Sequence, residues 1–323
     1  MIRLKIDIEI LKKLEKSIDT FNPEKGEVPI KILGYGEISL VFELLNNPEQ
    51  IAYKRIPIFD NETQVERHIW AYNEYNRLLT EDVGLNLPEY DVAWFKDEEE
   101  KIQFYCVQDK FPAESVGNKV IHQLSDEDIK TLILLVMREM KKVWDYGKNH
   151  NTIDLGLDGQ ISNFAVIGFD SNNPKIDLDT KLMYFDTSTP MFRVNGNEAM
   201  EAVLFLKSAP SFLRWLLKAL FLEETIGRYY DWRKVTIDLV ANFFKEQKPE
   251  LIPELINLIN KFFEEEANDF DIEPLTLEEV KKYYKSDSSM WVLFQNVRRF
   301  DRFLKTKIFK KKYDFYLPGK IER

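Results

Sequence analysis

The chain has 323 residues, of which 44% are hydrophobic and 31% are charged, and its net charge is −10. This length and composition predict a soluble, globular protein of one large domain or two modest ones, and no apolar run approaches the roughly 20 residues that cross a bilayer. A single cysteine, Cys106, excludes an internal disulfide, and three scattered histidines argue against a zinc site. The N-terminal MIRLKIDIEILKKLEK mixes charges among its apolar positions, so we expect no signal peptide and a cytoplasmic protein.

The first 110 residues predict a small mixed lobe. Residues 7–19 and 62–80 place apolar side chains at helical spacing. Between these two helices lie three runs typical of strands, VPIKIL, SLVFELL and IAYKRIPIF, and after the second helix come YDVAWF and IQFYCVQ. The expected order is a helix, three strands, a helix and two strands.

The rest of the chain, residues 111–323, predicts a larger and mainly helical lobe. Ser125 is a typical N-cap for a helix that continues to about Tyr146, and a small β region follows at 161–187. Further helices are expected at 197–221, 230–247, 251–267, 276–285 and 289–305. Thr276 and Glu279 form the pattern of a capping box.

The charge is spread unevenly. Residues 298–323 contain ten Lys/Arg and three Asp/Glu, which gives +7 and leaves −17 for residues 1–297. The body should repel nucleic acid, whereas the basic segment could contact an acidic partner. Because tyrosines and phenylalanines alternate with lysines in KTKIFKKKYDFY, we expect a packed helix end or strand with solvated lysines there. We favour that interpretation over an RNA-binding or membrane-binding tail.

The stretch LGYGEISLVF places Gly34 and Gly36 between two predicted strands. Glycines let backbone N–H groups approach phosphate oxygens, and a hairpin over a nucleotide fits better than a dinucleotide fold, in which a helix directly follows the glycines. Lys54 follows inside a strand, and Glu74 lies in the next helix. A buried ammonium needs a partner, so a Lys54–Glu74 pair could hold the lysine against phosphates. Each residue alone could equally be an ordinary surface charge.

Three polar residues flank a predicted hairpin in the second half. Asp158 and Asn163 stand five apart in LDGQISNF, and Asp186 ends the apolar run LMYF. One aspartate that accepts the proton of a hydroxyl, with an Asn/Asp pair that holds Mg²⁺, would suit phosphoryl transfer. Each of the three could otherwise be a turn residue.

The order G-x-G-x-x-S-x-V-F, A-x-K, helix Glu, D-x-x-x-x-N and strand Asp, over roughly residues 28–247, resembles the protein-kinase-like superfamily. It resembles the aminoglycoside phosphotransferase and choline kinase branch more than the protein kinases. The resemblance implies an α+β, two-lobe fold that uses ATP and Mg²⁺. The implied nucleotide contacts are Gly34, Gly36, Ser39 and Lys54 at the phosphates and Gln108, Asp109 and Phe111 of FYCVQDKFPAES beside adenine. The implied catalytic residues are Asp158 as base with Lys54 and its partner Glu74, and the implied metal ligands are Asn163 and Asp186.

The sequence also departs from that superfamily. Gly156 stands where a histidine is usual, Gln160 where a lysine or histidine is usual, and GFDSNNPKIDLDTK lengthens the expected hairpin. Only about ten residues separate Asp186 from the next predicted helix, which leaves little room for a peptide-binding segment. The expected activity is phosphoryl transfer to a hydroxyl of a small molecule. The alternatives are a nucleotide-binding pseudokinase with a scaffold or regulatory role, and adenylyl transfer. The acceptor and the oligomeric state are not predicted.

Overall fold

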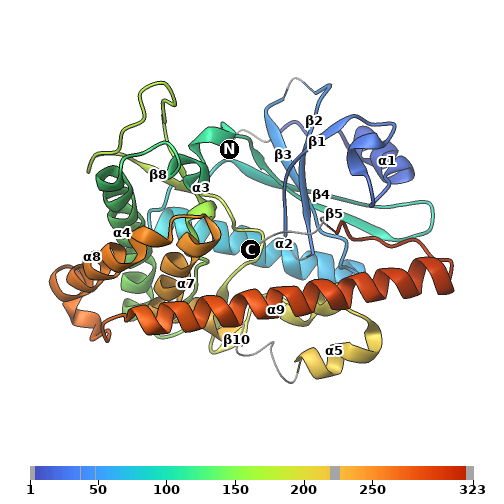
Figure 1. Ribbon diagram of the computed structural model, residues 1–323. Coiled ribbons are helices and arrows are strands. Elements are labelled where there is room, and N and C mark those ends of the chain that lie inside the picture. The colour runs from blue at the N-terminus through green and yellow to red at the C-terminus, as the bar shows by residue number, and fades with distance from the viewer. Residues whose placement is uncertain (1–3, 37, 48, 219–225, 318–323) are drawn as a thin grey trace.

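The small lobe is built on an antiparallel sheet. The computed structural model describes residues 4–36, 38–47, 49–218 and 226–317 (Figure 1). The five strands, in the spatial order β1-β2-β3-β5-β4, are β1 (Ile30–Tyr35), β2 (Leu40–Leu44), β3 (Ile51–Arg55), β4 (Tyr90–Lys96) and β5 (Ile102–Asp109). Every neighbouring pair is antiparallel. β3, which carries Lys54, is therefore the central strand and is hydrogen-bonded on both sides.

One helix covers each face of this sheet. Successive side chains of β5 point to opposite faces, so neighbouring residues of this strand pack against different helices. Tyr105 and Val107 pack in the cluster that contains α1 (Ile8–Ser17). Phe104 and Cys106 point to the other face, in the cluster that contains residues of α2 (Glu62–Arg77). Asp7 and Asn61 cap the two helices, at 3.0 Å from the amide nitrogens of Ile10 and Gln64. α2 also reaches the core of the helical lobe, so it joins the two lobes.

The second lobe is mainly helical and includes small β elements. Its helices are α3 (Gly117–Val120), α4 (Asp126–Asn149), α5 (Ser211–Leu217), α7 (Trp232–Lys245), α8 (Ile252–Glu265) and α9 (Leu277–Phe303). Its strands are β6 (Ile153–Leu155), β9 (Phe192–Val194) and β10 (Asn197–Glu198) in one sheet, and β7 (Phe164–Val166) with β8 (Leu182–Tyr184) in a hairpin. The long β7–β8 hairpin and the predicted fold class, an antiparallel sheet lobe followed by a helical lobe, are confirmed. None of the helices in the described ranges is long and apolar enough to cross a bilayer.

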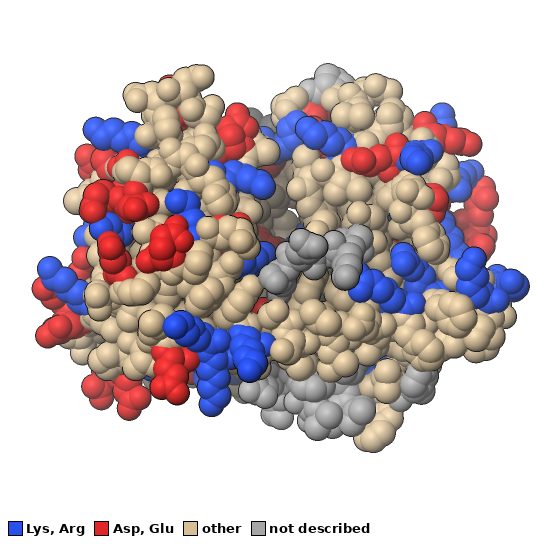
Figure 2. Space-filling model, in the orientation of Figure 1, with Lys and Arg blue, Asp and Glu red and all other residues tan. Residues whose placement is uncertain are grey.

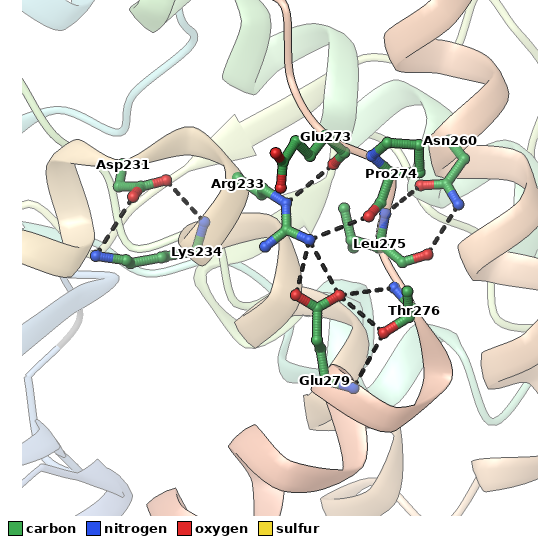
Figure 3. Close-up of polar contacts among 9 residues, drawn as sticks. All are labelled: Asp231, Arg233, Lys234, Asn260, Glu273, Pro274, Leu275, Thr276 and Glu279. Carbon is green, nitrogen blue, oxygen red and sulfur yellow. Dashed lines mark hydrogen bonds and ion pairs between the residues drawn. The ribbon is translucent and has the colours of Figure 1, made fainter.

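The predicted capping box at the start of α9 is present and extends into a larger polar cluster (Figure 3). The Thr276 hydroxyl accepts a hydrogen bond from the Glu279 amide, and the Glu279 carboxylate accepts one from the Thr276 amide at 3.1 Å. Arg233 of α7 donates to the same carboxylate at 2.9 Å. Asp231, two residues before Arg233, accepts the Lys234 amide as the N-cap of α7. Local side-chain contacts thus begin both helices and dock the first turn of α7 on α9.

Two helix predictions are wrong. The single helix expected at 197–221 is divided into β10, a 3₁₀ segment Ala202–Ser208 and α5, and its last residues, 219–221, lie outside the described ranges. The two helices expected at 276–285 and 289–305 are one helix, α9, of 27 residues. Lys285-Ser-Asp-Ser-Ser does not break it, because the Ser289 hydroxyl bonds back to the Lys285 carbonyl at 2.7 Å, a bond that a helix interior accommodates.

The C-terminal segment, which we expected in the helical lobe, returns to the small lobe. Burial alternates along it with a strand-like period of two, so that Tyr313, Phe315 and Leu317 are buried against the α2 face of the sheet. The Thr20 hydroxyl donates to the Tyr313 carbonyl at 2.7 Å. Arg298 of α9 is fully buried and donates to the Tyr316 carbonyl at 3.0 Å. The expected packed aromatic segment therefore exists, but only from residue 313 onward.

Candidate active site

Lys54 and Asp186 meet between the two lobes. The Lys54 Nζ lies 2.7 Å from the Asp186 Oδ1, although 132 residues separate them in the chain. β3 presents the lysine from the sheet, and β8 presents the aspartate just beyond its last residue, Tyr184. Burial alone would raise the pKa of Asp186, but the Lys54 ammonium and the Ser188 hydroxyl outweigh burial and hold that pKa below its usual value. The carboxylate is therefore charged at neutral pH. Figure 2 shows the surface hollowed between the two lobes.

Glu74 is not the partner of Lys54, which corrects the prediction. Glu74 accepts from Arg77, one helical turn along α2, at 2.8 Å and 3.0 Å. The face of α2 that points into the protein carries His68, Tyr72 and Tyr75, which are all at most 5% exposed. Since a helix turns by about 100° per residue, position 74 cannot share the face of positions 68, 72 and 75. Lys54 therefore finds its carboxylate on the other lobe.

Asp158 and Asn163 are held together in the loop before β7. The Asn163 Nδ2 donates to the Asp158 carbonyl at 3.2 Å, and the Gln160 amide donates to the Asp158 Oδ1 at 3.2 Å. The Phe185 amide donates to the Asn163 carbonyl at 3.1 Å, which extends the β7–β8 pairing by one step. That bond places Asn163 opposite the residue that precedes Asp186. The loop, the hairpin and Lys54 thus converge on one region.

The position of Gly156 explains why no histidine stands there. A Cβ on Gly156 would lie 2.8 Å from the Tyr229 carbonyl oxygen, which is backbone and cannot move aside. The loop is tied on both sides of this point, because the Gly156 amide donates to the Met191 carbonyl at 2.8 Å and the Leu157 amide to the Tyr229 carbonyl at 3.0 Å. The Tyr75 hydroxyl of α2 donates to the Gly156 carbonyl at 2.8 Å. Backbone contacts and a tyrosine from the small lobe therefore position the loop.

Sequence reasoning missed a second carboxylate, Asp238. It lies on α7, is 6% exposed, and accepts from the Gln160 Nε2 at 3.1 Å and from the Asn242 Nδ2 at 3.1 Å. Gln160 therefore contacts Asp158 through its backbone and Asp238 through its side chain. The signal that could have revealed Asp238 is a charged residue inside the apolar run VTIDLVANFF, with an amide four residues later.

Asp238 is one of the groups that raise the proton affinity of Asp158. Burial, followed by the charges of Asp238 and Asp186, raises the pKa of Asp158 to about 7, and Arg228 opposes this shift. Burial also raises the pKa of Asp238, against the opposing charge of Arg228. A carboxyl group with a pKa near neutrality is suited to accept a proton in catalysis. Asp158 is thus the group in the described part of this site best prepared to act as a general base.

We expect Asp238→Asn to move the acid limb of the pH–rate profile toward lower pH. In the wild type, a base that must lose its proton gives activity that rises with pH through about 7. Removal of the Asp238 charge lowers the pKa of Asp158, and a fall of about one pH unit corresponds to about 1.4 kcal/mol of lost repulsion. Initial rates measured against pH would show this, with Asp179→Asn, an exposed aspartate of the β7–β8 connection, as the control. An unchanged limb would separate Asp238 from the titration of Asp158.

The predicted nucleotide contacts lie at the edges of this region. Gln108 and Asp109 end β5, and the Phe111 ring packs on the Phe185 ring with centroids 4.6 Å apart. This contact joins the connection between the lobes to the residue before Asp186. At the other edge, the Gly36 amide donates to the Ser39 carbonyl at 3.0 Å and closes the β1–β2 turn. A Cβ on Gly36 would come 2.8 Å from the Ser39 Oγ, so glycine at this position lets the turn close over a buried serine. A Cβ on Gly34 would meet no atom within 4 Å, so space does not require glycine there.

The donor set fits a magnesium ion. The described residues form no group of three or more His, Cys, Asp or Glu side chains suited to a metal, but Mg²⁺ keeps several waters and needs only one or two carboxylates beside substrate phosphates. Asn163 uses its Nδ2 on the Asp158 carbonyl, which leaves its Oδ1 as the atom for a metal. Asp186 uses its Oδ1 on Lys54 and Ser188, which leaves its Oδ2. These two oxygens would hold the ion.

A family model matches residues 13–302. The chain belongs to DUF6206, a family of unknown function. The DUF6206 match runs from α1 to the end of α9 and includes every candidate site residue. No curated protein matches the chain.

Two solved structures show a distant likeness. WaaP in complex with acyl carrier protein is 11% identical with a TM-score of 0.32, over 83% of this chain and 98% of that one. The GDP complex of aminoglycoside 2′-phosphotransferase-IIIa is 12% identical with a TM-score of 0.34, over 82% of this chain and 100% of that one. Likeness at this level carries no argument about function, which must rest on the geometry of the site itself.

Proposed function

We propose that the protein transfers the γ-phosphoryl group of ATP to a hydroxyl group of a small molecule. The observation that carries the proposal is the 2.7 Å contact between Lys54 and Asp186, beside the loop that holds Asp158 and Asn163. A phosphate-binding cation, a metal-binding pair and a proton acceptor are the parts that phosphoryl transfer requires. Positioning and electrostatics then supply most of the catalysis, because the transferred group needs little covalent assistance.

Each residue has a distinct part in the proposed reaction. Asp158 accepts the proton of the acceptor hydroxyl as its oxygen bonds to the γ-phosphorus. The bond from that phosphorus to the bridging oxygen breaks, and ADP leaves with the electron pair. Lys54 binds phosphate oxygens, and Asn163 with Asp186 would hold Mg²⁺. When bound, Mg²⁺ would neutralise charge on the phosphate oxygens.

The chain after Asp186 favours a small acceptor. Only residues 187–191 separate it from β9, which pairs with β6 next to the loop of Asp158. An extended peptide substrate needs a segment to lie against, and these five residues leave no such segment. Arg228 and Tyr229, which contact each other at 2.9 Å near Asp158, would border the acceptor instead.

A specific observation favours a second function, nucleotide binding without transfer. Glu74 is engaged by Arg77, and Gln160 stands where a cationic side chain would assist transfer. A protein of this kind would bind ATP and act as a scaffold or regulator. Adenylyl transfer is a third outcome, which differs in the mass added to the product.

ATP with Mg²⁺ should raise the midpoint of thermal unfolding. A ligand that binds only the native state at 100 times its dissociation constant stabilises it by about 2.7 kcal/mol. The Lys54→Met variant should lose this stabilisation, whereas Lys31→Met, on the exposed edge strand β1, should keep it. Mass spectrometry of an acceptor panel then distinguishes phosphoryl from adenylyl addition. Stabilisation without any product would favour the regulatory function, and no stabilisation by any nucleotide would contradict both.

A further inference from the structure

In the C-terminal half of α9, polar side chains are buried and apolar side chains are exposed, which is the reverse of an ordinary surface helix. Gln295, Arg298 and Asp301 are buried, at 4%, 0% and 4% exposure. The opposite face carries four exposed apolar side chains, Val292, Leu293, Phe300 and Phe303, at 53%, 48%, 49% and 53% exposure. At about 100° per residue these four fall within about a third of the helix circumference. A surface helix normally buries its apolar stripe and exposes its polar one.

The buried polar face has a structural explanation. Arg298 donates to the Tyr316 carbonyl, so this face holds the returning C-terminal segment. Asp301 is paired with Lys305 at 2.8 Å. These contacts explain why Arg298 and Asp301 point inward, but they give no reason for the apolar residues on the outside.

The exposed apolar surface continues beyond the helix and becomes basic. After α9, Ile308 and Phe309 are 56% and 61% exposed, and Lys307, Lys310 and Lys311 beside them are also exposed. We call these five residues, together with the four apolar ones of α9, the basic–apolar surface. Figure 2 shows Lys and Arg gathered over the end of the molecule at which Figure 1 places the C-terminal end of α9. The packed aromatic segment expected from the sequence thus begins only at residue 313, and Phe309, which lay within that expected segment, is exposed.

We propose that the basic–apolar surface docks on a membrane of anionic lipids. Exposed aromatic and aliphatic side chains can enter the interface between headgroups and acyl chains, while adjacent lysines contact lipid phosphates. The segment 298–323 carries +7, in contrast to −17 for the remainder. The acidic body does not prevent this contact, because charges farther than about 10 Å are largely screened at 0.1 M salt. The inference is independent of the proposed phosphoryl transfer.

Other occupants fit this surface less well. A second copy of the chain, packed by a two-fold axis, would bring Lys307, Lys310 and Lys311 of both copies toward the same interface. Nucleic acid would use the lysines but gain little from Val292, Leu293 and Ile308, since its contacts are mainly to phosphates and base edges. A lipid surface uses both components together.

Vesicle co-sedimentation of the purified full chain tests the proposal. We expect binding to phosphatidylcholine vesicles that contain phosphatidylglycerol, little binding to phosphatidylcholine alone, and weaker binding at high salt. The variant Lys307→Glu/Lys310→Glu/Lys311→Glu and the variant Phe303→Ser/Phe309→Ser should each reduce binding at least about tenfold. Because the replaced side chains are exposed, both variants should keep the wild-type melting temperature.

Matched controls replace equally exposed residues elsewhere. Lys119→Glu/Lys175→Glu/Lys261→Glu makes the same change in net charge, and Leu178→Ser removes an apolar side chain that is 59% exposed. Both should bind vesicles like the wild type. Equal loss in the controls, or equal binding to neutral vesicles, would overturn the proposal. So would a concentration-dependent dimer that Phe303→Ser/Phe309→Ser dissolves, or RNA binding without vesicle binding.

Discussion

Replacement of Asp158 by asparagine should lower kcat by about 10²- to 10⁴-fold, the usual contribution of a positioned general base. Asparagine keeps the shape of the side chain but cannot accept the proton of the acceptor hydroxyl. The Asn163 amide donates to the backbone carbonyl of residue 158, so that contact survives the substitution. ATP binding should also survive, because Lys54 and Asp186, rather than Asp158, are the proposed phosphate and metal contacts.

The measurement compares kcat with nucleotide affinity in the same variant. Burial and the neighbouring carboxylates raise the pKa of Asp158 to about 7, so the neutral side chain of asparagine removes a repulsive charge and should not destabilise the fold. Asp154→Asn, an exposed residue of β6 in the same stretch of chain, serves as the matched control. A variant that transfers phosphoryl groups at the wild-type rate would remove Asp158 from the proposed role.

Replacement of Arg55 by methionine should destabilise the small lobe by about 3–5 kcal/mol, because it leaves a buried carboxylate without its cation. Arg55 lies next to Lys54 on β3, and its side chain is 4% exposed. It donates to both oxygens of Glu15, at 2.6 Å and 2.9 Å, and to the Asp314 carbonyl at 2.6 Å. Tyr105 also donates to Glu15. One guanidinium therefore joins α1, the centre of the sheet and the C-terminal segment.

Thermal or denaturant unfolding would measure this effect, and a double variant distinguishes its cause. Arg55→Met with Glu15→Leu removes both charges, so it should recover most of the stability lost in the single variant. Burial lowers the pKa of Arg55, but the charge of Glu15 and its hydrogen bonds raise it above the usual value, so the guanidinium stays charged throughout the accessible pH range. A single variant as stable as the wild type would show that the network contributes little to folding.

Local sequence signals predicted those parts of the fold that depend on neighbouring residues. Ser125 begins α4, and Thr276 with Glu279 begins α9, because a cap bonds to amides within its own first turn. The strands of the small lobe and the long β7–β8 hairpin follow from apolar runs and the turns between them. The five-residue spacing of Asp158 and Asn163 likewise placed both in one loop, since so short a segment cannot separate them.

Only the tertiary structure decided which distant residues meet. Asp186, rather than Glu74, contacts Lys54, because the rotation of α2 directs Glu74 away from the sheet. Asp238 joins the site through the packing of α7 on the loop of Asp158. The C-terminal segment is buried on the small lobe, and the end of α9 exposes its apolar face. Spacing along the chain carries no information about such contacts, because they depend on how whole elements pack, and many packings satisfy the same local pattern.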